Sequence, residues 1–309
     1  MKSLSIIVAA YNEEGNVADL HRQVIEVCQD QAYDFEFILV DDGSTDKTFE
    51  VASTLSPAKI IRFRKNFGQT AAIDAGIKAA KKEYLVTLDA DLQNDPNDIP
   101  AMIALLESMD LDVVSGWRRK RKDGFFKRFI SRGANLLRKI LVDDNINDSG
   151  CSLKVFKKSC FEGISLYGEM HRFIPAVLKI KGFKIGEIEV NHRPRHSGKT
   201  KYTWRRMIKG FMDMISVWFW NKYAARPVHL LGGIGLFFLL IGFFCGCMFL
   251  FHLFFGNRIS ESFWLALMLF TFLNGINVFI FSLFGDIMMK NYFERSNTQP
   301  YSIKEVIEN

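Results

Sequence analysis

Two long uncharged segments in the C-terminal third limit what this chain can fold into more than any other feature. Residues 228–255 and 263–285 contain no Asp, Glu, Lys or Arg. Each is longer than the roughly 20 apolar residues with which an α-helix crosses a bilayer. The linker between them, residues 256–262, is short, so we expect a transmembrane helical hairpin with both ends on one side. Asn274 and Asn277 are candidates for hydrogen bonds between helices or between copies of the chain, which makes a homo-oligomer a candidate assembly.

Lysine and arginine are distributed unequally around the hairpin. The linker carries only Arg258, whereas the flank before the first segment carries Lys199, Lys201, Arg205, Arg206, Lys209, Lys222 and Arg226. Because these residues concentrate on the cytoplasmic side of membranes, we expect a multi-pass protein of the inner or plasma membrane with both termini in the cytoplasm. The expected division is a cytoplasmic domain at residues 1–198, a juxtamembrane amphipathic helix at 199–226, the hairpin at 227–290 and a cytoplasmic tail at 291–309.

The N-terminal part alternates between strand-like and helical patterns. Short apolar runs, typical of buried strands, occupy residues 4–10, 35–40, 59–63, 84–88 and 112–115, and stretches with helical spacing separate most of them. This alternation predicts an α/β fold with a doubly wound, mostly parallel, Rossmann-like sheet.

Acidic residues follow three of these strands. They are Glu13 after Tyr11 and Asn12, the pair Asp41 and Asp42, and the pair Asp89 and Asp91 on either side of Ala90. The carboxyl ends of parallel strands meet at one edge of the sheet, where ligands bind in open α/β folds. Three acidic turns there would repel a diphosphate. Mg²⁺ or Mn²⁺ would bridge the carboxylates to the phosphate oxygens, so we expect one of these cations as cofactor.

Residues 117–139 combine many basic side chains with aromatic and aliphatic ones, including Phe125, Phe126 and Phe129. Such a segment is typical of a membrane surface with anionic head groups. Nucleic-acid binding is the competing interpretation, and two membrane spans in the same chain disfavour it. The chain also lacks the G-x-G-x-x-G and G-x-x-x-x-G-K-[ST] motifs, G-x-S-x-G and H-E-x-x-H. Dinucleotide oxidoreductases, P-loop enzymes, serine hydrolases of that type and zinc proteases therefore lose support.

Taken together, five motifs resemble the inverting family-two glycosyltransferases of GT-A fold. Within that family the chain looks like the polyprenyl-phosphate glycosyltransferases, such as dolichyl-phosphate mannose synthases and bacterial undecaprenyl-phosphate glucosyltransferases. The motifs are residues 11–14 (YNEE), 40–46 (VDDGSTD), 66–69 (NFGQ), 89–93 (DADLQ) and 197–202 (SGKTKY). The hairpin matches the membrane-bound members.

The resemblance implies a role for each candidate residue. The nucleotide-sugar donor would be held by Tyr11, Glu13, Asp41, Asp42 and Asp89. The metal would be arranged by Asp89, Asp91 and Gln93. The acceptor phosphate would be bound by Arg118, Arg132, Arg195 and Lys201. Asp148 would act as a base or orient the sugar, and it joins Asp89 and Asp91 as a candidate catalytic residue.

The implied reaction transfers a hexose, from UDP-glucose or a related UDP-sugar, to undecaprenyl or another polyprenyl phosphate. A lipid monophosphate has a second pKa near 6, so it is already mostly dianionic and nucleophilic at neutral pH. GDP-mannose is the alternative donor. A processive polysaccharide synthase is disfavoured because no Q-x-x-R-W segment is present. A non-catalytic membrane partner or lipid-sugar flippase would not need the acidic clusters.

Overall fold

The computed structural model describes residues 1–119, 146–164, 170–194, 227–255 and 258–296, with single residues 166, 168, 212, 215, 218, 219, 222 and 223. The chain divides into two compact units, residues 1–217 and 218–309. Each unit is described by itself below. Arg132, Arg195 and Lys201 lie outside the described residues, as do most of the basic segment and most of the predicted juxtamembrane helix.

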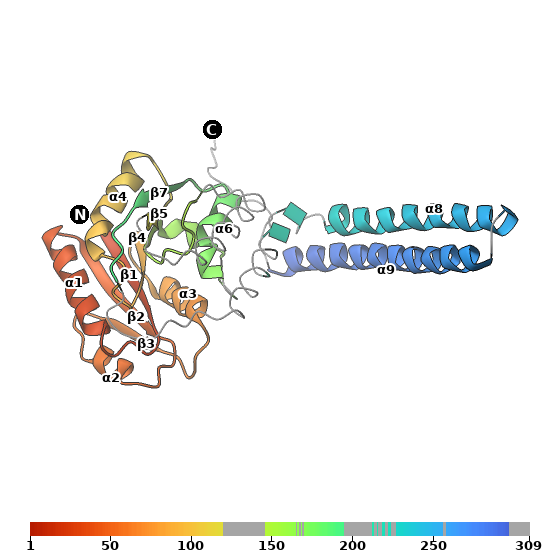
Figure 1. The fold of residues 1–309 in the computed structure, drawn as a ribbon. Coiled ribbons are helices and arrows are strands. Elements are labelled where there is room, and N and C mark those ends of the chain that lie inside the picture. The colour runs from red at the N-terminus through yellow and green to blue at the C-terminus, as the bar shows by residue number, and fades with distance from the viewer. Residues whose placement is uncertain are drawn as a thin grey trace. The chain divides into compact units, whose positions relative to one another are not determined.

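In the described part of the first unit, one sheet has the strand order β3-β2-β1-β4-β6-β5-β7 (Figure 1). The strands are β1 (Ser3–Ala10), β2 (Asp34–Asp41), β3 (Lys59–Arg62), β4 (Tyr84–Asp89), β5 (Val113–Trp117), β6 (Lys154–Lys157) and β7 (Ile185–Glu189). Neighbouring strands are parallel except where β6 pairs with β4 and with β5. The mostly parallel sheet expected from the sequence is confirmed. The antiparallel strand β6 was not predicted.

Helices cover both faces of this sheet. They are α1 (Val17–Asp30), α2 (Thr48–Ser53), α3 (Gln69–Ala79), α4 (Ile99–Ser108) and α6 (Ile174–Ile180), with 3-10 turns η1 (Pro96–Asp98), η2 (Lys158–Phe161) and η3 (Met170–Arg172). The 3-10 turn η3 leads directly into α6, and Pro175 occupies the first turn of α6. Proline suits that position because its missing N–H would have no partner in the helix anyway.

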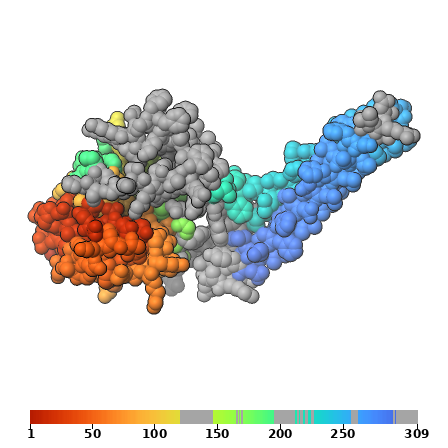
Figure 2. All heavy atoms as spheres, turned by 60° about the horizontal axis from the view of Figure 1, so that its bottom comes forward, coloured from red at the N-terminus to blue at the C-terminus, as the bar shows by residue number. Residues whose placement is uncertain are grey.

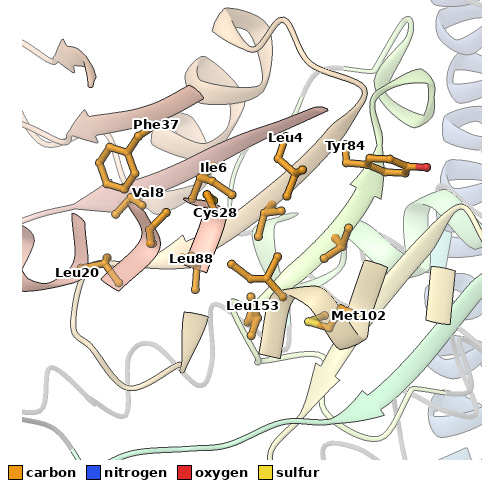
Figure 3. Close-up of a cluster of buried hydrophobic side chains, with 14 of the residues drawn as sticks. Leu4, Ile6, Val8, Leu20, Cys28, Phe37, Tyr84, Leu88, Met102 and Leu153 are labelled. Atoms are coloured by element: carbon orange, nitrogen blue, oxygen red, sulfur yellow. The ribbon is translucent and has the colours of Figure 1, made fainter. Parts of the chain in front are cut away.

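The core lies in two layers, one on each side of the sheet. In β1, Leu4, Ile6 and Val8 belong to the layer under α1 and α4, while Ile7 belongs to the layer under α3 and α6. All four side chains are fully buried, as the alternating directions of side chains in a doubly covered strand require. Burial of each such side chain contributes about 1.5–3 kcal/mol. Figure 3 shows residues of the first layer, with Leu20 from α1 near Val8 and Met102 from α4 near Leu153.

Strand register brings the predicted acidic turns to one edge. Ala10 at the end of β1 is level with Asp41 at the end of β2, and Ala9 is level with Asp89 at the end of β4. The chain therefore leaves all three strands at the same height. This common edge is where the candidate site forms.

The second unit contains the two long apolar helices. The π-helical turn η4 (Val228–Gly232) leads into α8 (Gly233–Phe255), and α9 (Arg258–Ser296) runs beside α8 (Figure 1, Figure 2). The segments Val228–Phe255 and Ser262–Met289 have mean hydropathies of 2.6 and 2.0, which suits a membrane span in length and composition. A Cβ on Gly235 or on Gly275 would meet backbone oxygen of the other helix at 3.0 Å. These glycines therefore allow the close helix approach seen in membrane hairpins.

Candidate active site

An open cavity of ≈ 710 Å³ lies where β1, β2 and β3 end. It is lined by Tyr11, Gly43, Ser44, Thr45, Arg62, Phe63, Arg64, Lys65 and Asn66. Ligand pockets in proteins usually enclose about 300–1,000 Å³, so a nucleoside-sized group fits. Of the predicted donor-binding residues, Tyr11 lines this cavity directly.

The turn after β2 is shaped by Gly43, which has a φ of +69°. A Cβ at this position would lie 2.4 Å from the backbone carbon of Lys65 and 2.7 Å from the nitrogen of Asn66. Only glycine combines this left-handed backbone with so close an approach. The turn after β2 and the loop after β3 consequently form one continuous wall of the cavity.

Asp41 and Asp42 use their carboxylates differently. Asp41 is fully buried, and its Oδ1 accepts the Ser44 N–H at 3.0 Å. Its Oδ2 is buried without a hydrogen bond and faces the Arg62 Nε at 3.4 Å, while the Arg62 guanidinium lies 4.1 Å above the Phe49 ring. The next residue, Asp42, turns toward the loop after β3.

The Asp42 carboxylate holds that loop in place. It accepts the Phe67 N–H at 2.7 Å and the Gly68 N–H at 2.9 Å. Burial raises the pKa of Asp42, and these two N–H groups act in the opposite direction. In the structure Asp42 therefore holds the loop that forms one wall of the cavity, and it does not itself line the cavity.

Glu13 closes the first acidic turn. Its Oε2 accepts the Asn16 side-chain N–H at 2.6 Å, and its backbone N–H donates to Thr48 Oγ1 at 2.8 Å. Asn12, with φ +56°, accepts the Thr45 N–H at 2.8 Å through its side chain. These bonds tie the turn after β1 to the turn after β2, which keeps Tyr11 at the cavity.

Asp89 ends β4, and Asp91 follows on a turn in which Leu92 has a φ of +59°. Gln69 Nε2 donates to Asp89 Oδ1 at 2.5 Å, and the Ser152 side chain also hydrogen-bonds Asp89. Burial raises the pKa of Asp89 to about 6, and the negative charge of Asp91 adds to the shift. Asp89 and Asp91 repel each other as carboxylates, and a cation bound between them would relieve that repulsion.

The donor atoms of this pair fit Mg²⁺ or Mn²⁺, because both ions prefer hard oxygen ligands. Within the described ranges no group of three or more His, Cys, Asp or Glu side chains is arranged to hold a metal by itself. Asp89 and Asp91 would supply two ligands, and diphosphate oxygens and water the others. Gln93 approaches through its backbone, since its N–H donates to Asp91 Oδ1 at 3.2 Å and its carbonyl accepts the Arg193 N–H at 2.8 Å.

Arg118 and Asp148, predicted for different tasks, form one ion pair. Arg118 Nε and Nη2 donate to the two Asp148 oxygens at 2.7 and 3.0 Å, and the Arg118 backbone N–H adds a third bond at 3.2 Å. Their side chains are only 10% and 18% exposed. Burial opposes ionisation of Asp148, but the Arg118 guanidinium outweighs it and lowers the pKa of this carboxyl below its usual value.

Lys154 brings a second buried cation to the site. It is 3% exposed, and it lies opposite Thr87 in the β4–β6 ladder, so that both project from the same face as Asp89. Its Nζ donates to the carbonyl oxygen of Cys151. Burial lowers the pKa of Lys154, while the carboxylates of Asp148 and Asp89 act in the opposite direction. A buried lysine is tolerated only beside such compensating charges.

Several site residues were missed by the sequence reasoning. Arg62, Arg64 and Lys65 form a basic run directly after the third predicted strand, and that position was the available signal. Gln69 lay inside a quoted motif without receiving a role. Lys154 gave no signal, because a lysine in a short, lysine-rich stretch is typical of a surface.

Comparisons with known proteins identify the family of this chain. Residues 5–164 match the model of the family Glycosyl transferase family 2. The chain is 42% identical over 241 residues to the dodecaprenyl-phosphate galacturonate synthase of Rhizobium johnstonii, covering 75% of this chain and 71% of that relative. It is 29% identical over 315 residues to the undecaprenyl-phosphate 4-deoxy-4-formamido-L-arabinose transferase of Proteus mirabilis, covering 99% and 94%.

A solved structure supports the fold independently. Glucosyl-3-phosphoglycerate synthase from Mycobacterium tuberculosis, crystallised with Mn²⁺ and UDP-glucose, superposes with a TM-score of 0.53 and 16% identity over 71% of this chain and 79% of that one. At this identity the likeness shows the GT-A fold alone. The family match spans more than half of the chain, and the relative from Rhizobium johnstonii is well above 30% identical. The chain belongs to glycosyl transferase family 2.

Proposed function

We propose that this glycosyltransferase moves a sugar from a UDP-sugar to a polyprenyl phosphate at the cytoplasmic face of the membrane. The observation that carries the proposal is the common edge of the sheet, where an open nucleoside-sized cavity lies at the ends of β1, β2 and β3 and the Asp89–Asp91 pair follows the neighbouring strand β4. The names of the two relatives support a polyprenyl-phosphate acceptor. The two apolar helices suit an acceptor that resides in a bilayer.

On the donor side, the cavity with Tyr11 would hold the nucleoside. Asp41, buried behind the lining residues Ser44 and Arg62, would support that wall. Asp89 and Asp91 would hold Mg²⁺ or Mn²⁺, which supplies charge neutralisation for the departing diphosphate. The solved neighbour with Mn²⁺ and UDP-glucose supports this choice of cation and of nucleotide. Gln93 contributes by fixing the Asp91 turn through its backbone.

On the acceptor side, Arg118 would attract the lipid phosphate, together with Arg132, Arg195 and Lys201. Forked guanidinium donors suit phosphate oxygens well. A dianionic phosphate oxygen attacks the anomeric carbon in line. The new bond joins that oxygen to the carbon, the bond from the carbon to the diphosphate breaks, and UDP leaves, so configuration at the carbon inverts.

Asp148 fits a positioning role better than that of a general base. The nucleophile is already ionised near neutral pH. The low pKa of Asp148 makes it a weak base, and its carboxylate is occupied by Arg118. We therefore assign to Asp148 the orientation of Arg118 for the incoming phosphate.

The sugar is tested by offering donors in parallel. Purified protein with a short polyprenyl phosphate and Mn²⁺ is incubated with labelled UDP-glucose, UDP-galacturonate, UDP-GlcNAc, UDP-galactose and GDP-mannose. We expect label from one UDP-sugar in the organic phase. UDP-galacturonate joins UDP-glucose as a first candidate because of the name of the relative from Rhizobium johnstonii. Transfer from GDP-mannose alone would overturn the choice of nucleotide, and transfer from none would overturn the function.

The same assay separates an enzyme from a scaffold or flippase. Asp91→Ala is expected to abolish cation-dependent transfer, since it removes one of the two carboxylates at the end of β4. Asp30→Ala, at the exposed end of α1, is the matched control and should retain full activity. Full activity of Asp91→Ala would contradict the assigned role.

The membrane arrangement is proposed with the function. The Lys and Arg distribution supports cytoplasmic termini, and residues 1–198, 199–226, 227–290 and 291–309 are the proposed divisions. Labelling of single cysteines at the hairpin tip and in the tail with a membrane-impermeant maleimide tests this. We expect labelling from outside only at the tip, and labelling at the tail would reverse the orientation.

A further inference from the structure

Gln69 makes a contact that none of the assigned roles explains. Its Nε2 donates to Asp89 Oδ1 at 2.5 Å, and a hydrogen bond to an ionised carboxylate is stronger than one between neutral groups. Gln69 is half-buried and begins α3, twenty positions before Asp89 in the chain. The contact therefore joins the start of α3 to the end of β4 at Asp89, one of the two proposed metal-binding carboxylates.

The backbone that presents Gln69 is held from two directions. The N–H groups of Phe67 and Gly68 donate to the buried carboxylate of Asp42. On the other side, Thr70 Oγ1 lies 2.8 Å from Nδ1 of His171 in η3, and both of these residues are buried. A side chain on so constrained a backbone can orient its partner.

The same loop also forms part of the cavity. Phe63, Arg64, Lys65 and Asn66 line it, and Gln69 follows three positions later. The loop after β3 thus contacts the proposed nucleoside position at one end and Asp89 at the other. The two halves of the donor site share one element.

We propose that Gln69 is a positioning residue that holds the Asp89 carboxylate in the orientation needed for the cation and the donor diphosphate. The inference rests on the proposed function and extends it to a residue without a role there. Carboxylates that ligate metals are usually hydrogen-bonded themselves, and loss of such a partner costs about 10–100-fold in metal affinity or activity.

The test compares Gln69→Ala and Gln69→Glu with Gln29→Ala, an exposed glutamine of α1. Full-length protein in detergent is titrated with Mn²⁺ by electron paramagnetic resonance, without substrate, and kcat, KM and the thermal midpoint are measured. For Gln69→Ala we expect about tenfold weaker Mn²⁺ binding and about tenfold lower kcat. At saturating Mn²⁺ the KM for the UDP-sugar should change little, because the residues that line the nucleoside cavity remain.

Gln69→Glu separates positioning from a merely structural role. Glutamate in the first turn of a helix is favourable, so a residue that only begins α3 would keep its kcat and its thermal midpoint. If residue 69 positions Asp89, the new glutamate places a negative charge against the Asp89 carboxylate, and we expect kcat to fall further than in Gln69→Ala. Wild-type Mn²⁺ affinity and kcat in both variants would overturn the inference. Absence of Mn²⁺ binding and transfer in the wild type would overturn the proposed function instead.

Discussion

The ion pair between Arg118 and Asp148 gives the most quantitative prediction. Removing one partner of a buried pair leaves the other charged and unpaired, which costs about 3–5 kcal/mol. Their remaining exposure of 10% and 18% lets water reach the orphaned group, so we take the lower end, about 3 kcal/mol, for Asp148→Ala. In a domain of this size 1 kcal/mol lowers the thermal midpoint by about 2–4 °C, so we expect a fall of about 6–12 °C.

A double-mutant cycle isolates the pair itself. Arg118→Ala, Asp148→Ala and the double variant are unfolded thermally in detergent at pH 7, with intrinsic fluorescence as the signal. Because the double variant leaves no orphaned charge, it should be more stable than the sum of the single effects by about 2 kcal/mol. Additive effects within about 0.5 kcal/mol would show that the two side chains act independently, and would refute the assignment of Asp148 to the orientation of Arg118.

The pH dependence of this pair has a definite sign. The pKa of Asp148 is lowered in the folded protein, so its contribution to stability is complete above the ordinary pKa of an aspartate and is lost as pH falls through the lowered value. Measurements at pH 7 therefore report the full effect. The difference between wild type and Asp148→Asn should shrink under strongly acid conditions.

Two further predictions follow from the cavity and the metal-binding pair. Gly43→Ala and Gly163→Ala carry the same backbone strain, with φ of +69° and +68°, but of these two only Gly43 is crowded, by Lys65 and Asn66. Both variants should lose about 1–2 kcal/mol of unfolding free energy, and Gly43→Ala should lose about 1–3 kcal/mol more and bind UDP more weakly in calorimetry. Equal losses would contradict the close packing of the cavity wall. The pKa of Asp89, raised to about 6, means that its contribution to the stability of the metal-free protein is present below the ordinary pKa and lost as pH rises through 6. Since a ligand must be deprotonated, Mn²⁺ affinity should rise up to about pH 6 and then level off, and an affinity unchanged between about pH 5 and 7 would count against Asp89 as a ligand.

The parallel part of the sheet was predictable because its signals are local. A strand covered on both faces is apolar at consecutive positions, as in Leu85 and Val86, and this pattern differs from that of a surface helix. The strand ends then place the acidic turns together without any knowledge of tertiary contacts. For this reason Tyr11, Asp89 and Asp91 were correctly expected at one edge of the sheet.

The remaining parts depend on contacts between distant residues. Strand β6 contains Lys154 at a buried position, and only the charges of Asp89 and Asp148 make that burial tolerable. Arg118 and Asp148 are thirty positions apart, so no local sequence pattern indicates that they form an ion pair with each other. Gln69 likewise reaches Asp89 from the start of α3, whereas Gln93, four positions after Asp89, contributes its backbone N–H, to Asp91.

The antiparallel pairing of β5 with β6 has a consequence for how this family can diversify. The chain leaves the sheet at Trp117 and re-enters it at Lys154, and Ser115 lies directly opposite Lys154. The end of β5 and the start of β6 are therefore neighbours, and the Arg118–Asp148 ion pair links the two chain segments beside them. The pairing of β1 with β4, at whose ends Tyr11 and Asp89 lie, involves neither end of this excursion. Under the proposed function, the acceptor side can therefore change while the nucleoside cavity is kept.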